Sequence, residues 1–166
     1  MNGAVASATM QPMEDEAVSP IPKRILVAYD FSGPARRALS LARDLQAAHD
    51  AAVDVVHVVH DPYEGLEHPP RESVWVNEME TERYLDSLRE RMEADVEGTF
   101  GQAKASVKVH VVRGDIDDGV LKLREQTGAD LVVVGTTGKG AVDRFLLGSV
   151  STRLLHRSNV PVLTVP

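Results

Sequence analysis

Apolar residues in this chain form short runs that alternate with segments of helical spacing. Five runs rich in valine, isoleucine and leucine predict strands, at residues 25–30, 53–59, 107–112, 131–134 and 160–165. Apolar residues three and four positions apart predict the helices between them, at residues 34–45, 85–98, 119–127 and 149–157. Strands alternating with helices predict an α/β fold, in which an open parallel sheet carries helices on both faces.

Two segments lie outside this pattern. Residues 1–22 are polar, contain prolines and lack an apolar run, so we expect a leader before a domain at residues 23–166. Residues 61–75 hold three prolines and read as a long loop at the carboxyl end of the second strand. We expect this loop to act as a lid, with Tyr63 or Trp75 near a ligand.

Composition narrows the class of protein. The chain has 166 residues, of which 4 % are aromatic and none is cysteine. The lack of cysteine excludes a disulfide framework, a cysteine-ligated zinc and a thiol nucleophile, and it suits a cytoplasmic location. Its net charge of −7 argues against nucleic acid and membrane surfaces as partners. Eleven acids fall in residues 64–97, whereas residues 131–166 hold four bases and one acid. The basic C-terminal part could receive a small anion.

Two of the predicted strands end in residues that are common at ligand-binding sites. Asp30 ends the first strand and Gly135 ends the fourth. Ligands of open parallel sheets bind at the carboxyl ends of strands, where the strand order reverses. We therefore expect the first and fourth strands to be neighbours at such a point. Asp30 could instead cap the first helix or bond nearby backbone, and we favour contact with a ligand.

Glycines are closely spaced after the fourth strand. Gly135, Gly138 and Gly140 precede Gly148 and Ser149, which open the last helix. Glycines let backbone N–H groups approach an anion, and a helix start presents further N–H groups and a positive dipole end. The spacing fits neither the Walker loop nor the dinucleotide fingerprint. The alternative is that these glycines serve only a turn and a helix start.

Other polar groups have two interpretations each. Lys139 is either a solvated loop charge or a ligand of terminal phosphates. The acids at 115, 117 and 118 resemble a metal cluster, although acids are also favoured at helix starts. His57 and His60 are three residues apart on a strand, so they face opposite sides and do not share a metal.

The glycine spacing resembles a signature of the universal stress protein family. In that family, a glycine, two residues, a glycine, nine residues, a glycine and a serine or threonine bind ATP, and Gly135, Gly138, Gly148 and Ser149 match without a gap. The resemblance covers Lys23 to Pro166. It implies a Rossmann-like fold with a five-stranded parallel sheet in the order 3-2-1-4-5, and an ATP site across the first and fourth strands.

The resemblance also implies which residues contact the nucleotide. The acid after the first strand, Asp30, lies by the ribose and phosphates and can reach a Mg²⁺ ion that the phosphates share, and no other side chain is expected to hold a metal. The backbone near Ala28 and Val58 borders the adenine. The full expected set comprises Ala28, Tyr29, Asp30, Val58, Gly135, Thr137, Gly138, Lys139, Gly148, Ser149, Val150 and Ser151.

The implied function is a cytoplasmic, nucleotide-dependent regulator of the stress response. It binds ATP with Mg²⁺, or AMP or ADP, has slow or no hydrolysis, and is not primarily an enzyme. A homodimer forms through the closing strand from Val160 to Val165, and a regulatory protein partner is expected; nucleic acid and membrane insertion are not. Two rival functions are an interaction module that binds no nucleotide and an ATP-using transferase or hydrolase.

Overall fold

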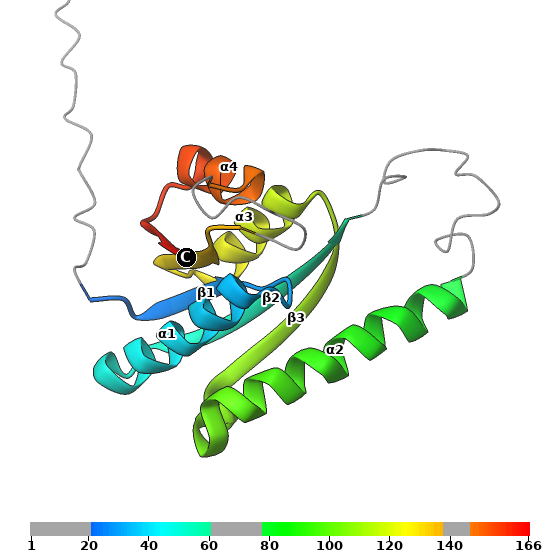
Figure 1. Cartoon of the computed structure of the whole chain (residues 1–166), viewed down its shortest axis with the longest axis horizontal. Coiled ribbons are helices and arrows are strands. Elements are labelled where there is room, and N and C mark those ends of the chain that lie inside the picture. The colour runs from blue at the N-terminus through cyan, green and yellow to red at the C-terminus, as the bar shows by residue number, and fades with distance from the viewer. Residues whose placement is uncertain (1–20, 61–77, 138–146) are drawn as a thin grey trace, which may run out of the picture.

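The computed structural model describes residues 21–60, 78–137 and 147–166, which form one five-stranded parallel sheet and its helices (Figure 1). The elements are β1 (Arg24–Ala28), α1 (Gly33–His49), β2 (Ala52–His60), α2 (Glu78–Phe100), the 3₁₀ helix η2 (Gly101–Ser106), β3 (Val107–Gly114), α3 (Ile116–Thr127), β4 (Leu131–Gly135), α4 (Ser149–Arg157) and β5 (Val162–Val165). The strand order β3-β2-β1-β4-β5 confirms the expected topology. Tyr63 and Trp75, which we expected in a lid, lie outside the described residues.

Most predicted element bounds differ from the structure by one to seven residues, and the largest difference is the start of α2 at Glu78 rather than residue 85. Helix α3 begins at Ile116 rather than Gly119, because the Asp115 side chain accepts from backbone N–H groups of the first turn and caps the helix there. Strand β5 begins at Val162, since Pro161 has no N–H to donate to a neighbouring strand. Helix α2 continues past Gly98 to Phe100 and is followed by η2.

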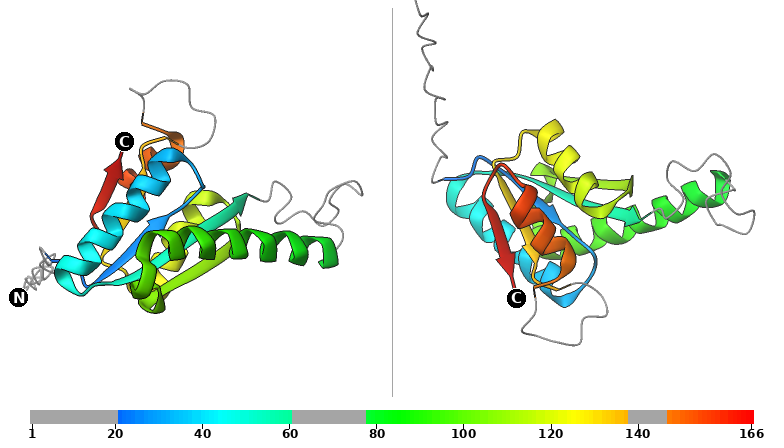
Figure 2. Two further views of the ribbon diagram at one scale, coloured as in Figure 1. Left: turned by 60° about the horizontal axis from the view of Figure 1, so that its bottom comes forward. Right: turned by 90° about the horizontal axis from the view of Figure 1, so that it is seen from above.

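Helices cover both faces of the sheet. Ile25 and Val27 of β1 pack with α1 and α2 on one face, whereas Leu26 packs with α3 and α4 on the other. These three residues have no exposed surface, as alternation along a strand buried on both faces requires. Figure 2 shows the two helix layers and the N-terminal part of α2 projecting past the end of the sheet.

The start of β1 is tied to the start of β4. The Asp130 carboxylate accepts the backbone N–H of Lys23 at 2.9 Å and that of Arg24 at 2.9 Å. In turn, the Asp130 N–H donates to the Arg24 carbonyl at 3.0 Å. These bonds join residues more than 100 positions apart and set the register in which Ile25 lies beside Leu131.

Helix α3 packs unusually close to the sheet. A Cβ atom on Gly119 would lie 2.9 Å from a methyl carbon of Val58 on β2, a distance that real Cβ atoms do not show. Glycine therefore permits this approach at the cost of some helix propensity. Among the described residues, no helix combines the length and apolarity needed to cross a bilayer.

A buried carboxylate occupies β2 near the amino ends of the strands. Asp54 has no exposed surface and accepts hydrogen bonds from Arg24 Nη1 at 2.8 Å and His110 Nε2 at 2.7 Å. Burial alone would raise the pKa of Asp54, but the hydrogen bonds from His110 and Arg24 outweigh it and hold the pKa below its usual value. The Asp54 carboxylate thus connects side chains of three neighbouring strands, β1, β2 and β3.

We expect Asp54→Asn to lower the free energy of unfolding at pH 7 by about 2–4 kcal/mol, because it leaves Arg24 and His110 without their charged partner. The depressed pKa means that the ionised Asp54 stabilises the fold above the unfolded-state pKa of about 4, and that this stabilisation is lost as pH falls through the lower folded value. Urea unfolding from pH 7 to pH 3 measures this difference.

The exposed Asp44 of α1 provides a matched control, because Arg43 is the one contact that its carboxylate makes within the described part of the chain. Asp44→Asn should change the free energy of unfolding by less than about 0.5 kcal/mol. A gap between Asp54→Asn and the native chain that stays constant down to pH 3 would contradict the stabilising charge.

Candidate functional site

A cavity of about 980 Å³ lies over the carboxyl ends of β1, β2 and β4. The turn after β1, the first turns of α3 and α4, and the N-terminal part of α2 complete its walls. It therefore sits where the strand order reverses, between β1 and β4, as the sequence predicts.

The structure brings ten of the predicted site residues together around this cavity. They are Ala28, Tyr29, Asp30, Val58, Gly135, Thr137, Gly148, Ser149, Val150 and Ser151. The two others, Gly138 and Lys139, lie outside the described residues, so both interpretations of Lys139 stay open.

Sequence reasoning missed an apolar wall and a polar end of the cavity. The apolar wall comes from two strands and α3: Val56, Ile116, Val120 and Val134 join Val58 there. The polar end comes from β2 and α2 and holds His57, His60, Glu80 and Tyr84. The alternation of β2 could have identified Val56, since it shares a face with Val58.

Asp30 lines the cavity and also shapes the turn after β1. Its Oδ1 atom accepts the Ser32 N–H at 3.0 Å. The cap of α1 is Ser32 itself, whose hydroxyl accepts the Ala35 N–H at 3.2 Å. Asp30 therefore does not cap the first helix, but it does bond nearby backbone as the alternative predicts, and its carboxylate also borders the cavity.

Tyr29 contributes backbone rather than its side chain to the site. The ring is 3 % exposed and packs toward α1 and α2, where the hydroxyl donates to Asp95 Oδ2 at 2.5 Å. Burial, with a smaller contribution from the hydrogen bond to Asp95, raises the pKa of Tyr29 well above its usual value, so the phenol stays protonated. Its carbonyl is 2.7 Å from His57 Nδ1. Because a carbonyl only accepts, His57 Nδ1 carries the hydrogen.

Two glycines of the signature have packing roles. A Cβ atom on Gly135 would lie 2.8 Å from Pro34 Cβ and 2.9 Å from the Ala35 nitrogen, so β4 could not end this close to the start of α1. A Cβ atom on Gly148 would lie 3.0 Å from the Thr136 oxygen, to which the Gly148 N–H donates at 2.6 Å. Packing therefore requires glycine at both positions and brings the start of α4 to the end of β4, while the approach of backbone N–H groups to an anion stays a prediction.

The first turn of α4 faces the cavity with backbone groups. Gly148 is the N-cap and has no side chain with which to cap the helix, and Ser149 and Val150 line the cavity. The buried Ser151 hydroxyl lies 3.1 Å from the Thr136 oxygen and 2.9 Å from the Gly148 oxygen, so its hydrogen stays within the protein. Such a helix start provides N–H groups and a positive dipole end for an anion.

Two of the four C-terminal bases are already paired. Arg153 Nε donates to Asp117 at 2.5 Å, and Arg157 donates to both Asp117 and Asp118. Burial would raise the pKa of Asp117, but the arginines outweigh it and lower the pKa. These two arginines therefore join α4 to α3, and their charges are balanced by Asp117 and Asp118.

The same contacts explain the acidic cluster. The ligand-type oxygens of the acids at 115, 117 and 118 lie within 4.8 Å of one another. Asp115 caps α3, and the other two bind the arginines of α4. Packing and capping account for all three acids, which supports the interpretation as helix-start acids.

A doubly wound parallel sheet with a cavity at the reversal of strand order defines the class of α/β ligand-binding domains. Residues 22–166 match the Universal stress protein family, so the chain belongs to it. Universal stress protein MJ0531 of Methanocaldococcus jannaschii is 31 % identical over 148 residues, which cover 86 % of this chain and 81 % of that protein. Universal stress protein A homolog 1 of Coxiella burnetii is 30 % identical over 149 residues, which cover 86 % of this chain and 95 % of that protein.

Solved structures show the same fold. Protein MJ0577 of Methanocaldococcus jannaschii superposes with a TM-score of 0.67 at 29 % identity, over 87 % of this chain and 96 % of that one. A universal stress protein in complex with cAMP has a TM-score of 0.57 at 23 % identity, over 87 % of this chain and 97 % of that one, and shares the fold.

Gly135→Ala tests the packing role without any ligand. We expect it to lower the free energy of unfolding by about 1–3 kcal/mol, since the new methyl group meets the backbone of α1. Gly98→Ala is the matched control, because beyond its own stretch of α2 no described atom lies within 4 Å of its Cβ position, and it should be neutral or stabilise by up to about 1 kcal/mol. Equal melting temperatures for Gly135→Ala and the native chain would refute the close approach.

Proposed function

We propose that this protein binds ATP with Mg²⁺ in the cavity and acts as a nucleotide-dependent regulator of the stress response. The observation that carries this proposal is the combination of three features in one cavity: an apolar wall, the Asp30 carboxylate and the start of α4. Apolar residues suit a base, a carboxylate suits ribose hydroxyls or a metal, and a helix start suits phosphates. A protein of the same fold in complex with cAMP supports this class of ligand.

The strand order suggests how the nucleotide lies. Four of the five residues of the apolar wall lie on β2 and α3, with Val134 of β4 as the fifth; Asp30 follows β1, and α4 begins beyond β4. Because β1 lies between β2 and β4, these parts form a line across the sheet of about 10 Å, with strands about 4.8 Å apart. Adenine on the wall, ribose at Asp30 and phosphates at α4 follow that line.

Mg²⁺ is the metal that this arrangement suits. It prefers oxygen ligands and is usually held by one or two carboxylates together with substrate phosphates. Asp30 is the carboxylate at the expected position of ribose and phosphates. Asp30 would hold the ion, which neutralises phosphate charge when bound.

We propose slow or no hydrolysis as part of this function. The cavity's histidines and Glu80 come from β2 and α2, the end away from α4, where the phosphates are proposed to lie. An ATP-using transferase or hydrolase, the rival enzyme function, would instead release ADP or AMP at a rate well above a trace.

The alternative of an interaction module without nucleotide rests on a specific observation, the packing roles of Gly135 and Gly148. Both glycines are needed for the fold whether or not a ligand binds. The three features of the cavity outweigh it, because the packing of two glycines does not account for a carboxylate, an apolar wall and a helix start around one cavity.

Calorimetry with ATP and Mg²⁺ tests the proposal. The native chain should bind, and Asp30→Ala should weaken binding by about ten- to a hundredfold, the effect of losing hydrogen bonds to a charged group. Asp44→Ala, on the exposed surface of α1, should bind as the native chain does. Absence of heat with the native chain would favour the interaction module.

We also propose a homodimer through β5. This strand lies at the edge of the sheet, and Leu163 is 37 % exposed on it, with Leu155 45 % exposed on the adjacent α4. An exposed apolar edge strand can pair with another strand, and a second copy of the chain presents a matching one.

The proposed function also includes a cytoplasmic location, consistent with the absence of cysteine, and a regulatory protein partner.

Light scattering at micromolar concentration measures the dimer. The native chain should have twice the mass of one chain, and Leu163→Glu should shift it to a monomer, because the charge would be buried at the interface. Met79→Glu, which replaces an exposed apolar residue of α2, should leave the dimer intact. A native chain that scatters as a monomer would overturn this assignment.

A further inference from the structure

Phe31 has an uncommon backbone conformation directly after the proposed ligand residue Asp30. Its φ angle is 65°, in the left-handed region that bulky residues rarely adopt. The side chain is nonetheless 4 % exposed and belongs to the core between the sheet and helices α1 and α2. A conformation of this kind persists only where surrounding contacts hold it.

Contacts from three elements hold Phe31. The Arg36 Nη1 atom of α1 donates to the Phe31 carbonyl at 2.8 Å. The rings of Tyr29 and His57 meet the Phe31 ring edge-on, with centroids 5.2 and 5.1 Å away. The Arg91 guanidinium of α2 lies 4.3 Å from the centre of the Phe31 ring, a cation–π contact.

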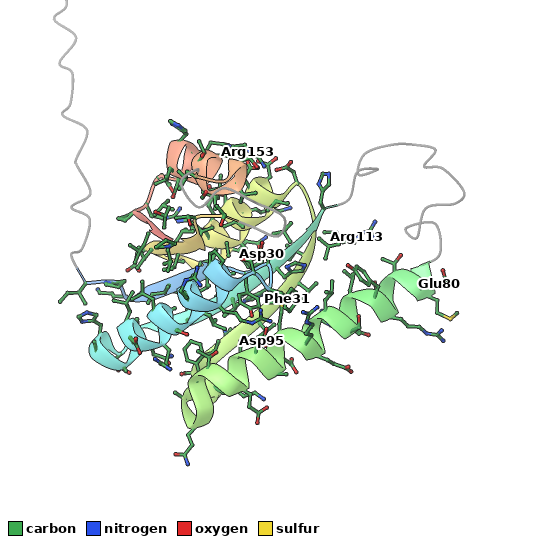
Figure 3. The ribbon with its side chains drawn as sticks, viewed as in Figure 1. Asp30, Phe31, Glu80, Asp95, Arg113 and Arg153 are labelled. Atoms are coloured by element: carbon green, nitrogen blue, oxygen red, sulfur yellow. The ribbon has the colours of Figure 1, made fainter. Side chains whose placement is uncertain are left out.

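Helix α2 also holds the residue on the other side of Asp30. Asp95 accepts the Tyr29 hydroxyl at 2.5 Å and lies 3.3 Å from Arg36 Nη2. Asp30 is therefore bracketed by two buried aromatic residues, each of which contacts α2. Figure 3 shows Phe31 and Asp95 between the turn after β1 and α2.

We propose that Arg91 and Asp95 are positioning residues, which set the place of the Asp30 carboxylate in the cavity by fixing Phe31 and Tyr29. This inference rests on the proposed nucleotide binding at Asp30. Neither Arg91 nor Asp95 lines the cavity, which α2 borders nearer its start at Glu80 and Tyr84, so the route that we assign to their effect on a ligand is their contact with the turn after β1. Coupling is reciprocal: a ligand that holds Asp30 also strengthens the contact between the turn and α2. The strength of the contact between α2 and the turn therefore depends on whether a ligand occupies the cavity.

Calorimetry with ATP and Mg²⁺ on Arg91→Gln and Asp95→Asn tests the positioning role. Each substitution should weaken binding by about three- to tenfold, the range of a single cation–π or charge-assisted contact. Arg89→Gln is the matched control, because Arg89 contacts Asp86 on the exposed surface of the same helix, and it should bind as the native chain does. Unchanged affinity in both variants would overturn the inference.

A double-mutant cycle separates positioning from a general loss of structure. In an Asp30→Asn background, Arg91→Gln and Asp95→Asn should each change the affinity by less than about twofold, because their effect passes through the Asp30 carboxylate. The same loss of affinity in both backgrounds would overturn the inference while leaving nucleotide binding intact. Arg91 is exposed, so its variant keeps the test informative if Asp95→Asn folds poorly.

Hydrogen exchange of the Ser32 amide gives a readout that needs no ligand. This N–H donates to Asp30 Oδ1 at 3.0 Å, so its protection reports the position of the carboxylate. Exchange should be at least about tenfold faster in Arg91→Gln and Asp95→Asn and unchanged in Arg89→Gln. If the native chain binds no ATP, the proposed function fails, and this exchange alone decides the inference: equal rates in all variants overturn it.

Discussion

Ile25, Leu26 and Val27 of β1 have no exposed surface because helices cover both faces of the sheet at its central strand. Burying apolar side chains on both faces is the dominant favourable term in such a fold. It requires partners on each side, so α1 and α2 must pack on one face and α3 and α4 on the other. The positions of all four helices therefore follow from the burial of this strand.

The reversal of strand order beside β1 determines where a ligand can enter. Connections after β1 and β4 lead to opposite faces, which leaves the carboxyl ends of the two strands open between them. At Gly135, which has no Cβ atom, the end of β4 lies in direct contact with the start of α1. The cavity is thus a result of the same packing that completes the core, with Asp30 and the start of α4 at its rim.

Apolar periodicity, a local pattern, predicted the strands, and the resemblance carried by the glycine signature implied their order and ten of the residues that line the cavity. The sequence could not predict contacts between distant segments. Nothing in the sequence indicates that Arg153 and Arg157 form ion pairs with Asp117 of another helix. The packing role of Gly135 depends on Pro34, about 100 residues earlier. Asp54 gave a usable signal, since an acid within an apolar strand needs a buried partner.

The long-range tie between Asp130 and the start of β1 also concerns synthesis on the ribosome. β1 is made early, but one of its two neighbours, β4, ends at Gly135. Until then the nascent chain can pair β1 on one edge only, and the other edge exposes an apolar strand that can associate wrongly. Contacts between distant residues of this kind slow folding, so completion of the domain waits for the last third of the chain.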